Sequence, residues 1–209
     1  MSNDLLEDGP PDAAWTVILA HGAGAGMDTP WMTAVATQLA AHDIHVVRFE
    51  FPYMAARRRD GKRRPPDRAP VLLDAWRAVA ARFDPSRLVI GGKSMGGRMA
   101  SMVADELRVA GLVCLGYPFH PPGRPEKLRT EHLAALRTRA LIAQGERDPF
   151  GTRDEVAGYA LSPAIRLQWL PGGNHDFTPP RGSGRTQKQN VAEAVDAVAA
   201  FVVGLDPAT

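Results

Sequence analysis

The feature that most constrains the fold is a serine framed by glycines between two segments of different periodicity. Residues 88–91 are a short apolar run, residues 92–96 read Gly-Lys-Ser-Met-Gly, and residues 97–107 carry apolar side chains at helical spacing. A chain that turns this sharply from a strand into a helix needs residues without a Cβ on both sides of the turn. The pattern therefore predicts a buried strand, a tight turn that presents Ser94 at the end of a sheet, and a helix.

The rest of the chain repeats the alternation of short apolar runs with segments of helical period. This alternation is typical of a parallel sheet with helices on both of its faces. The expected strands are residues 15–20, 44–49, 88–91, 112–115, 140–143 and 165–170. We therefore expect an α/β fold with about six strands in a mainly parallel sheet. It should form one domain, residues 1–209, in which residues 1–14 are an N-terminal extension.

Helix signals lie between these strands. Thr29 followed by Pro30 predicts a helix that begins there, with the threonine as its N-cap. Apolar side chains recur at helical spacing over residues 72–83 and 191–202. Both segments are expected to be helices that bury these apolar stripes in the core.

Composition excludes several classes of protein. The chain has 209 residues, a net charge of +2 and one cysteine, Cys114, so it has neither an intrachain disulfide nor a cysteine metal cluster. Its first residues are acidic, and no run of 18 apolar residues occurs. We expect a soluble cytoplasmic protein with no metal, no cofactor, and neither nucleic acid nor membrane as a partner, with Cys114 as a buried hydrophobic residue.

The cationic side chains are concentrated in residues 53–70. This segment is rich in proline and basic residues and poor in apolar ones, which predicts a surface loop after the second strand. Because residues that follow a parallel strand emerge at the carboxyl edge of the sheet, the loop starts where ligands bind. Two interpretations remain open: a solvated loop that maintains solubility, or a rim that attracts anionic substrates toward Ser94.

A serine becomes a nucleophile only beside a base that a third group orients. Asp148 follows the strand expected at 140–143, and His175 follows the strand expected at 165–170. The chain order Ser, Asp, His is the one found where the serine lies in a strand-to-helix turn. We predict Ser94 as nucleophile, His175 as general base and Asp148 as its acidic partner. Glu146 and Asp176 compete for the acidic role, although Asp176 is too close in sequence to reach the far ring nitrogen of its neighbour.

Acyl transfer also needs N–H donors for the developing oxyanion. One candidate is the N–H of Met95, at the start of a helix whose dipole favours negative charge. The other lies in the small-residue loop of residues 21–26, where we choose the N–H of Ala23. His21 is expected to hold this loop in place rather than to catalyse.

Substrate contacts are harder to infer. Gly24 belongs to the same small-residue loop, and Tyr117 and Phe119 follow the fourth expected strand at its carboxyl end. These three residues are predicted to line the pocket, with loop packing as the alternative for the two aromatic residues. Lys93 and Arg98 could contact a substrate carboxylate, but solvated charge is the simpler interpretation.

Four segments together resemble a known family: residues 21–26, 51–54, 91–98 and 145–150. They resemble the compact α/β-hydrolase family named for the testis-expressed and non-specific-lethal-complex subunit-three hydrolase-like proteins, near the dienelactone hydrolases. The resemblance spans most of the chain and implies an α/β-hydrolase fold without a cap domain. Residues 117–136, between the fourth and fifth strands, are too few to form one.

The expected activity is that of a serine hydrolase which cleaves small carboxylic esters through an acyl-enzyme on Ser94. The substrate would be a small molecule, possibly anionic, in an open and shallow pocket. Thioester, amide or peptide hydrolysis uses the same residues and stays open. The dienelactone hydrolases carry a cysteine where this chain has Ser94, so the resemblance does not imply their particular reaction. Chromatin-associated members of the family resemble scaffolds, so a non-catalytic binding protein is a further alternative. Both a monomer and a homodimer are compatible with the sequence.

Overall fold

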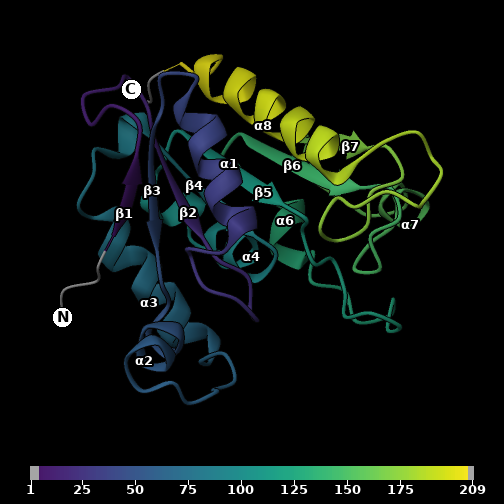
Figure 1. Cartoon of the computed structure of the whole chain (residues 1–209), viewed down its shortest axis with the longest axis horizontal. Coiled ribbons are helices and arrows are strands. Elements are labelled where there is room, and N and C mark those ends of the chain that lie inside the picture. Colours follow the sequence, from purple (N-terminus) through teal and green to yellow (C-terminus); the bar gives the residue numbers. More distant parts are fainter. Residues whose placement is uncertain (1–4, 207–209) are drawn as a thin grey trace.

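The computed structural model describes residues 5–206 and contains, within them, a seven-stranded sheet (Figure 1). The strand order is β1-β3-β2-β4-β5-β6-β7, and all neighbours are parallel except β1 and β3. The strands are β1 (Leu6–Asp8), β2 (Thr16–Ala20), β3 (His45–Phe49), β4 (Leu88–Lys93), β5 (Gly111–Leu115), β6 (Ala140–Gly145) and β7 (Ile165–Leu170). The six expected strands are confirmed, with ends that differ by at most two residues.

The first strand corrects the expected N-terminal extension. Residues Leu6–Asp8 pair antiparallel with β3 at the edge of the sheet. Asp8 accepts a hydrogen bond of 2.8 Å from the buried guanidinium of Arg48, a residue of β3 that lies forty positions later in the chain. A three-residue strand with two acidic residues shows no strand pattern in the sequence, because it forms only through pairing with β3. Residues 1–4 of the expected extension lie outside the described residues.

Helices cover both faces of the sheet (Figure 1). The α-helices are α1 (Pro30–Ala40), α2 (Pro52–Asp60), α3 (Ala69–Ala80), α4 (Met95–Ser101), α5 (Ala104–Leu107), α6 (Glu131–Ala134), α7 (Arg153–Val156) and α8 (Gln187–Val203), with a short 3-10 helix η1 (Pro85–Arg87) before β4. Apolar side chains of α1 and α8 pack on one face, and those of α2, α3 and α4 pack on the other. The helix predicted to begin at Pro30 is confirmed, since Thr29 Oγ1 accepts a hydrogen bond from the Met32 N–H.

The two-sided core follows from the alternation of side chains along each strand. In β2, Val17 and Leu19 belong to the cluster under α1 and α8, whereas Ile18 and Ala20 belong to the cluster under α3 and α4. Because six strands run parallel, their carboxyl ends meet at one edge of the sheet. The loops at this edge carry Ser94, Asp148 and His175.

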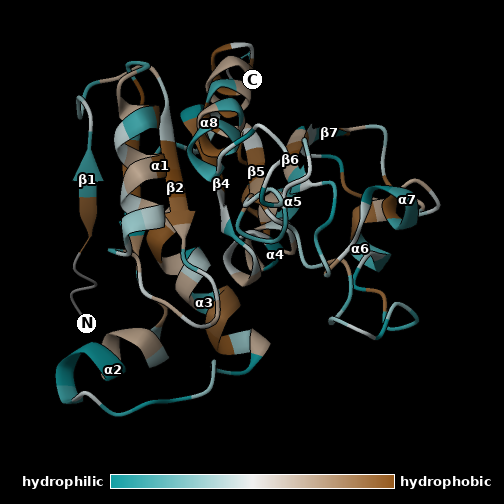
Figure 2. Cartoon of the chain, turned by 45° about the vertical axis from the view of Figure 1, so that its right-hand side comes forward, coloured by the Kyte–Doolittle hydropathy of each residue, from teal (hydrophilic) through white to brown (hydrophobic). Residues whose placement is uncertain are grey.

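Only part of the basic segment is the surface loop that the sequence predicts: residues 61–68 have no regular structure and are mostly exposed, but the residues before them are helical. Residues Pro52–Asp60 form α2, which begins with a proline and ends at Gly61, whose φ of 70° is the left-handed conformation that glycine adopts without strain. Tyr53 and Met54 are buried, while the arginines face outward, and Figure 2 shows the later turns of α2 as hydrophilic. Arg58 pairs with Glu50 and Asp28, so part of the positive charge is already neutralised.

Candidate active site

Ser94 lies in a strained turn between β4 and α4. Its φ of 51° and ψ of −114° fall outside the regions that residues with a Cβ readily adopt. The turn passes so close to β2 that a Cβ at either Gly92 or Gly96 would collide with the carbonyl oxygen of Ala20. The flanking glycines therefore allow the turn, and the turn lifts the Ser94 hydroxyl above the end of the sheet.

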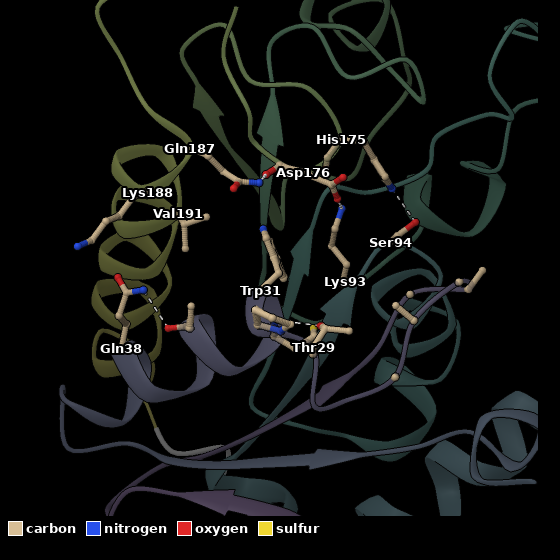
Figure 3. A pocket seen from close by; sticks show the side chains of 18 of the residues that line it. Thr29, Trp31, Gln38, Lys93, Ser94, His175, Asp176, Gln187, Lys188 and Val191 are labelled. Atoms are coloured by element: carbon tan, nitrogen blue, oxygen red, sulfur yellow. Dashed lines mark hydrogen bonds and ion pairs between the residues drawn. The ribbon is translucent and has the colours of Figure 1, made fainter. Parts of the chain in front are cut away.

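The imidazole of His175 joins the two other predicted residues. His175 Nε2 lies 2.9 Å from Ser94 Oγ, and His175 Nδ1 lies 2.8 Å from Asp148 Oδ2 (Figure 3 shows the first contact). Because a carboxylate only accepts hydrogen bonds, Nδ1 carries the proton and Nε2 is free to accept the hydroxyl hydrogen. The structure thus brings Ser94, His175 and Asp148 together from three separate loops.

Asp148 is fully buried, and both of its carboxylate oxygens accept hydrogen bonds. Besides His175, Oδ2 accepts from Gln144 Nε2 at 3.0 Å, and Oδ1 accepts from the Phe150 N–H at 2.9 Å. These bonds hold the carboxylate in one orientation, because moving it would leave a buried charge without partners.

The two competing carboxylates are occupied elsewhere. Glu146 accepts hydrogen bonds from the Gly172 N–H and from Arg153, and the bond from Gly172 holds the pKa of Glu146 below its usual range. Asp176 lies 3.3 Å from the ammonium group of Lys93 and is largely exposed. Neither of them contacts the ring of His175 in the described hydrogen bonds.

Lys93 corrects the expectation of a solvated charge. Its side chain is buried, and Nζ donates to the carbonyl oxygen of His175 as well as pairing with Asp176. Burial lowers the pKa of Lys93, although the Asp176 carboxylate acts in the opposite direction. The Phe150 ring packs against the imidazole of His175, with 4.2 Å between the ring centroids. The sequence gives no signal for Lys93, since its partners follow eighty residues later in the chain.

The loop of residues 22–26 is held by side chains on the side that faces α2. Three consecutive carbonyl groups accept from three side chains: Gly22 from His21 Nδ1 at 2.6 Å, Ala23 from the Tyr53 hydroxyl at 2.9 Å and Gly24 from Arg57 Nη1 at 3.3 Å. A trans peptide unit carries its C=O and N–H on opposite sides. The Tyr53 hydroxyl also donates to the Gly22 carbonyl at 3.4 Å. The N–H groups of Ala23, Gly24 and Ala25, which belong to the same three peptide units, therefore point away from α2. The loop also lies close to the serine, because a Cβ placed on Gly22 would be 3.8 Å from Ser94 Cβ.

His21 has the structural role expected from the sequence. It is fully buried, and its Nε2 accepts from the Phe51 N–H at 3.1 Å while Nδ1 donates within the loop. Burial lowers the pKa of His21, which favours the neutral ring that this pair of bonds requires. The roles of Tyr53 and Arg57 in holding the loop were missed, because both residues lie about thirty positions away from it.

The second candidate donor lies at the start of α4. The first hydrogen bond within this helix runs from the Arg98 N–H to the Ser94 carbonyl at 3.0 Å. The N–H groups of Met95, Gly96 and Gly97 precede it, and such groups at a helix start find no partner inside the helix. The Met95 N–H thus belongs to a turn that directly adjoins the Ser94 hydroxyl.

A cavity of about 830 Å³ opens at Ser94 and is lined by His175, Ala23 and Gly24 among others. Its lining continues between α1 and α8 (Figure 3), so the cavity extends well beyond Ser94. A smaller hollow of about 360 Å³ lies on the α2 side of the same loop, next to Arg57 and Arg58.

Tyr117 and Phe119 do not line this cavity, which corrects that prediction. Both side chains are fully buried, with ring centroids 4.8 Å apart, and the Tyr117 hydroxyl donates to the carbonyl of Arg129 at 3.0 Å. The chain turns inward after β5 at Gly116, whose φ is 70°. Large apolar rings then fill the core, which is the alternative that the sequence left open. Arg98 is half-buried rather than solvated, and Cys114 is buried as expected.

Residues 5–206 show neither a metal-binding cluster nor a membrane-spanning helix. In this part of the chain, no group of three or more His, Cys, Asp or Glu side chains is arranged to hold a metal ion. None of the helices described there combines the length and the apolar character needed to span a membrane.

A model of a family described as the alpha/beta hydrolase domain matches residues 13–203. The fold is similar to an α/β serine hydrolase without a lid from Xanthomonas campestris, with a TM-score of 0.70 and 22% identity, covering 95% of this chain and 88% of that one. An esterase domain from a Rhodothermus marinus protein has a TM-score of 0.68 and 17% identity, with 95% and 91% covered. A dienelactone hydrolase from Anabaena variabilis has a TM-score of 0.67 and 22% identity, with 94% and 87% covered. The fold expected from the sequence, without a cap, is thereby confirmed.

Proposed function

The chain belongs to the alpha/beta hydrolase family, and from this premise we propose that it is a serine hydrolase that cleaves carboxylic esters of small molecules. The observation that carries the proposal is the single imidazole of His175, bonded through one nitrogen to Ser94 Oγ and through the other to a buried carboxylate. This is the arrangement that activates a serine hydroxyl for attack on an acyl carbon.

In the proposed reaction, Ser94 Oγ attacks the ester carbonyl carbon while its proton passes to His175 Nε2. The carbonyl electron pair moves onto oxygen, and Asp148 stabilises the imidazolium that has formed. When the tetrahedral intermediate collapses, the alkoxide leaves and takes the proton from His175. Water then attacks the acyl-enzyme with His175 again as base, which releases the carboxylic acid and restores the Ser94 hydroxyl.

We propose that the N–H groups of Ala23 and Met95 bind the oxyanion. In support, the Gly22 carbonyl accepts from His21 and from the Tyr53 hydroxyl, which turns the Ala23 N–H of the same peptide unit away from them, and the Met95 N–H begins a helix beside Ser94. Each such donor contributes on the order of 3 kcal/mol to transition-state stabilisation in acyl transfer. We also propose a cytoplasmic site of action, which suits a chain whose one cysteine is buried.

The test combines an active-site label with turnover. Wild type should react covalently with a fluorophosphonate probe and hydrolyse p-nitrophenyl acetate and butyrate. The changes Ser94→Ala and His175→Ala should each lower ester turnover by about a thousandfold or more, with the fold retained by circular dichroism. The matched control is Ser183→Ala, an exposed serine in the loop before α8, which should behave as wild type.

Residual turnover within tenfold of wild type in either variant would remove that residue from its proposed role. If neither esters nor thioesters and amides were cleaved and no label were taken up, the hydrolase proposal would be rejected in favour of a binding protein.

A further inference from the structure

The cavity at Ser94 continues as a groove between two helices. One wall belongs to α1 and includes Trp31, Ala34 and Gln38, while the other belongs to α8 and includes Lys188 and Val191. Figure 3 shows Ser94 and His175 at one end of the cavity and Gln38 and Lys188 at the other. The space is therefore longer than a short acyl group needs.

The middle of the groove presents mostly carbon to a ligand. Pro30, Trp31 and Ala34 lie on the α1 side, and Val191 faces them from α8. Two polar lining side chains of this stretch already have partners: Thr29 Oγ1 accepts from Met32, and the Gln187 amide donates to the Asp176 carbonyl. The Trp31 indole N–H has no partner within residues 5–206, but it is buried.

The ammonium group of Lys93, which also lines the cavity, is engaged as well. Lys93 Nζ is bonded to Asp176 and to the His175 carbonyl, and it lies 5.3 Å from the Trp31 ring centroid. An occupant of the middle of the groove thus meets apolar surface, which favours an alkyl chain over a polar group.

The length of the groove limits the length of that chain. From Trp31 to Gln38 the helix rises about 10 Å, at 1.5 Å per residue. An extended chain advances about 1.2 Å per single bond, as the span of an extended peptide residue shows. About eight carbons therefore span the stretch from Trp31 to Gln38, and the carbons that lead from Ser94 to Trp31 come in addition.

We propose that this groove binds the acyl chain of a medium-chain ester, of about eight carbons or more, whose carbonyl carbon lies at Ser94. The inference rests on the proposed function and names its substrate class. The acyl side of the ester is favoured over the alcohol side for a geometric reason. The leaving oxygen must stay beside His175 Nε2 to receive its proton, whereas the loop 22–26 that would bind the carbonyl oxygen leads directly into α1.

A blocked groove provides the test. Ala34 lines the cavity at an exposed position of α1, so Ala34→Trp fills the groove without entering the core. The matched control is Thr37→Trp, which is also exposed on α1 but does not line the cavity. For wild type, kcat/KM on p-nitrophenyl esters should rise by about tenfold or more from acetate to octanoate, because buried methylenes add binding energy.

Ala34→Trp should lower the octanoate value by about tenfold while acetate stays within about twofold. Thr37→Trp should leave both unchanged. Equal effects of the two tryptophan substitutions would overturn the proposal. It would also be overturned if Ala34→Trp changed the chain-length dependence only for alkyl acetates, in which the alcohol is the long part, because the alcohol would then occupy the groove.

A binding measurement separates this proposal from the proposed function. Octanoate should bind to the Ser94→Ala variant in calorimetry, and adding Ala34→Trp should weaken that binding by about tenfold. Octanoate binding that depends on Ala34, in a protein that cleaves no ester, would support the groove and reject the hydrolase. Ester cleavage with no octanoate binding would support the hydrolase and reject the groove.

Discussion

The turn around Ser94 and the loop of residues 22–26 adjoin the same cavity but are held in different ways. The turn depends on its own glycines, which pass within contact of the neighbouring strand. The loop depends on Tyr53 and Arg57, which reach it from α2 about thirty residues later. A conformation built into a turn is coupled to folding of the sheet, whereas one imposed by distant side chains can be changed without unfolding the protein.

This difference predicts that a glycine substitution lowers the stability of the protein much more in the turn than in the loop. Gly96→Ala would push a Cβ into the Ala20 carbonyl of β2, whereas Gly24→Ala would place a Cβ in open space. We expect Gly96→Ala to lower the free energy of unfolding by about 3 kcal/mol or more and Gly24→Ala to change it by about 0.5 kcal/mol at most. Urea denaturation measures both. Equal losses would show that the two regions are not held differently.

The acidic member of the proposed triad should show the next largest effect. Asp148→Asn keeps the shape of the side chain but favours the wrong tautomer of His175, so ester turnover should fall by about a hundredfold or more. Glu146→Gln serves as the matched control and should stay near wild type, because Glu146 contacts Gly172 and Arg153 instead. If Asp148→Asn kept the ester turnover of wild type and Glu146→Gln lost it, Glu146 and not Asp148 would be the acidic member of the triad.

The loop side can be tested through one hydroxyl. Tyr53→Phe removes the bonds to the Gly22 and Ala23 carbonyls while the buried ring remains, and we expect kcat to fall by about five- to tenfold with little change in KM. Thermal unfolding should shift little. Tyr159→Phe, at a half-buried tyrosine that packs on Phe119, is the control. A proportional loss of stability and activity would point to a merely structural role for Tyr53.

The smallest expected effect concerns the remaining cations of the basic segment. Arg59 and Arg63 are exposed and take part in none of the ion pairs found in residues 5–206. Replacing both by Gln should lower kcat/KM by about two- to threefold for an anionic ester at low salt, and by less for a neutral ester of equal length. Arg82 and Arg87, exposed near the opposite edge of the sheet, provide the control pair. If kcat/KM for the anionic ester did not change with salt concentration, the basic segment would be a solvated surface without a role in attracting substrate.

The same contrast explains what the sequence could and could not predict. Ser94, Asp148 and His175 follow three strands of a parallel sheet, so the strand pattern alone places them at one edge. Lys93 and Tyr53 could not be placed, because their partners come from other loops of that edge. The helix α2 was missed since it buries only two apolar residues, although Pro52 and Gly61 marked its ends. Tyr117 and Phe119 were assigned to the wrong side, because a strand end does not show which way the following chain turns.

The short strand β1 has a consequence for handling the protein. It covers β3, whose five residues are all buried, and its Asp8 neutralises the buried Arg48. Without β1, the backbone N–H and C=O groups of β3 would form an open edge able to pair with another chain, and an uncompensated cation would sit beneath it. Shortening the chain past Leu6 should therefore produce aggregation before any loss of catalytic machinery, which makes the N-terminal segment a poor place to trim.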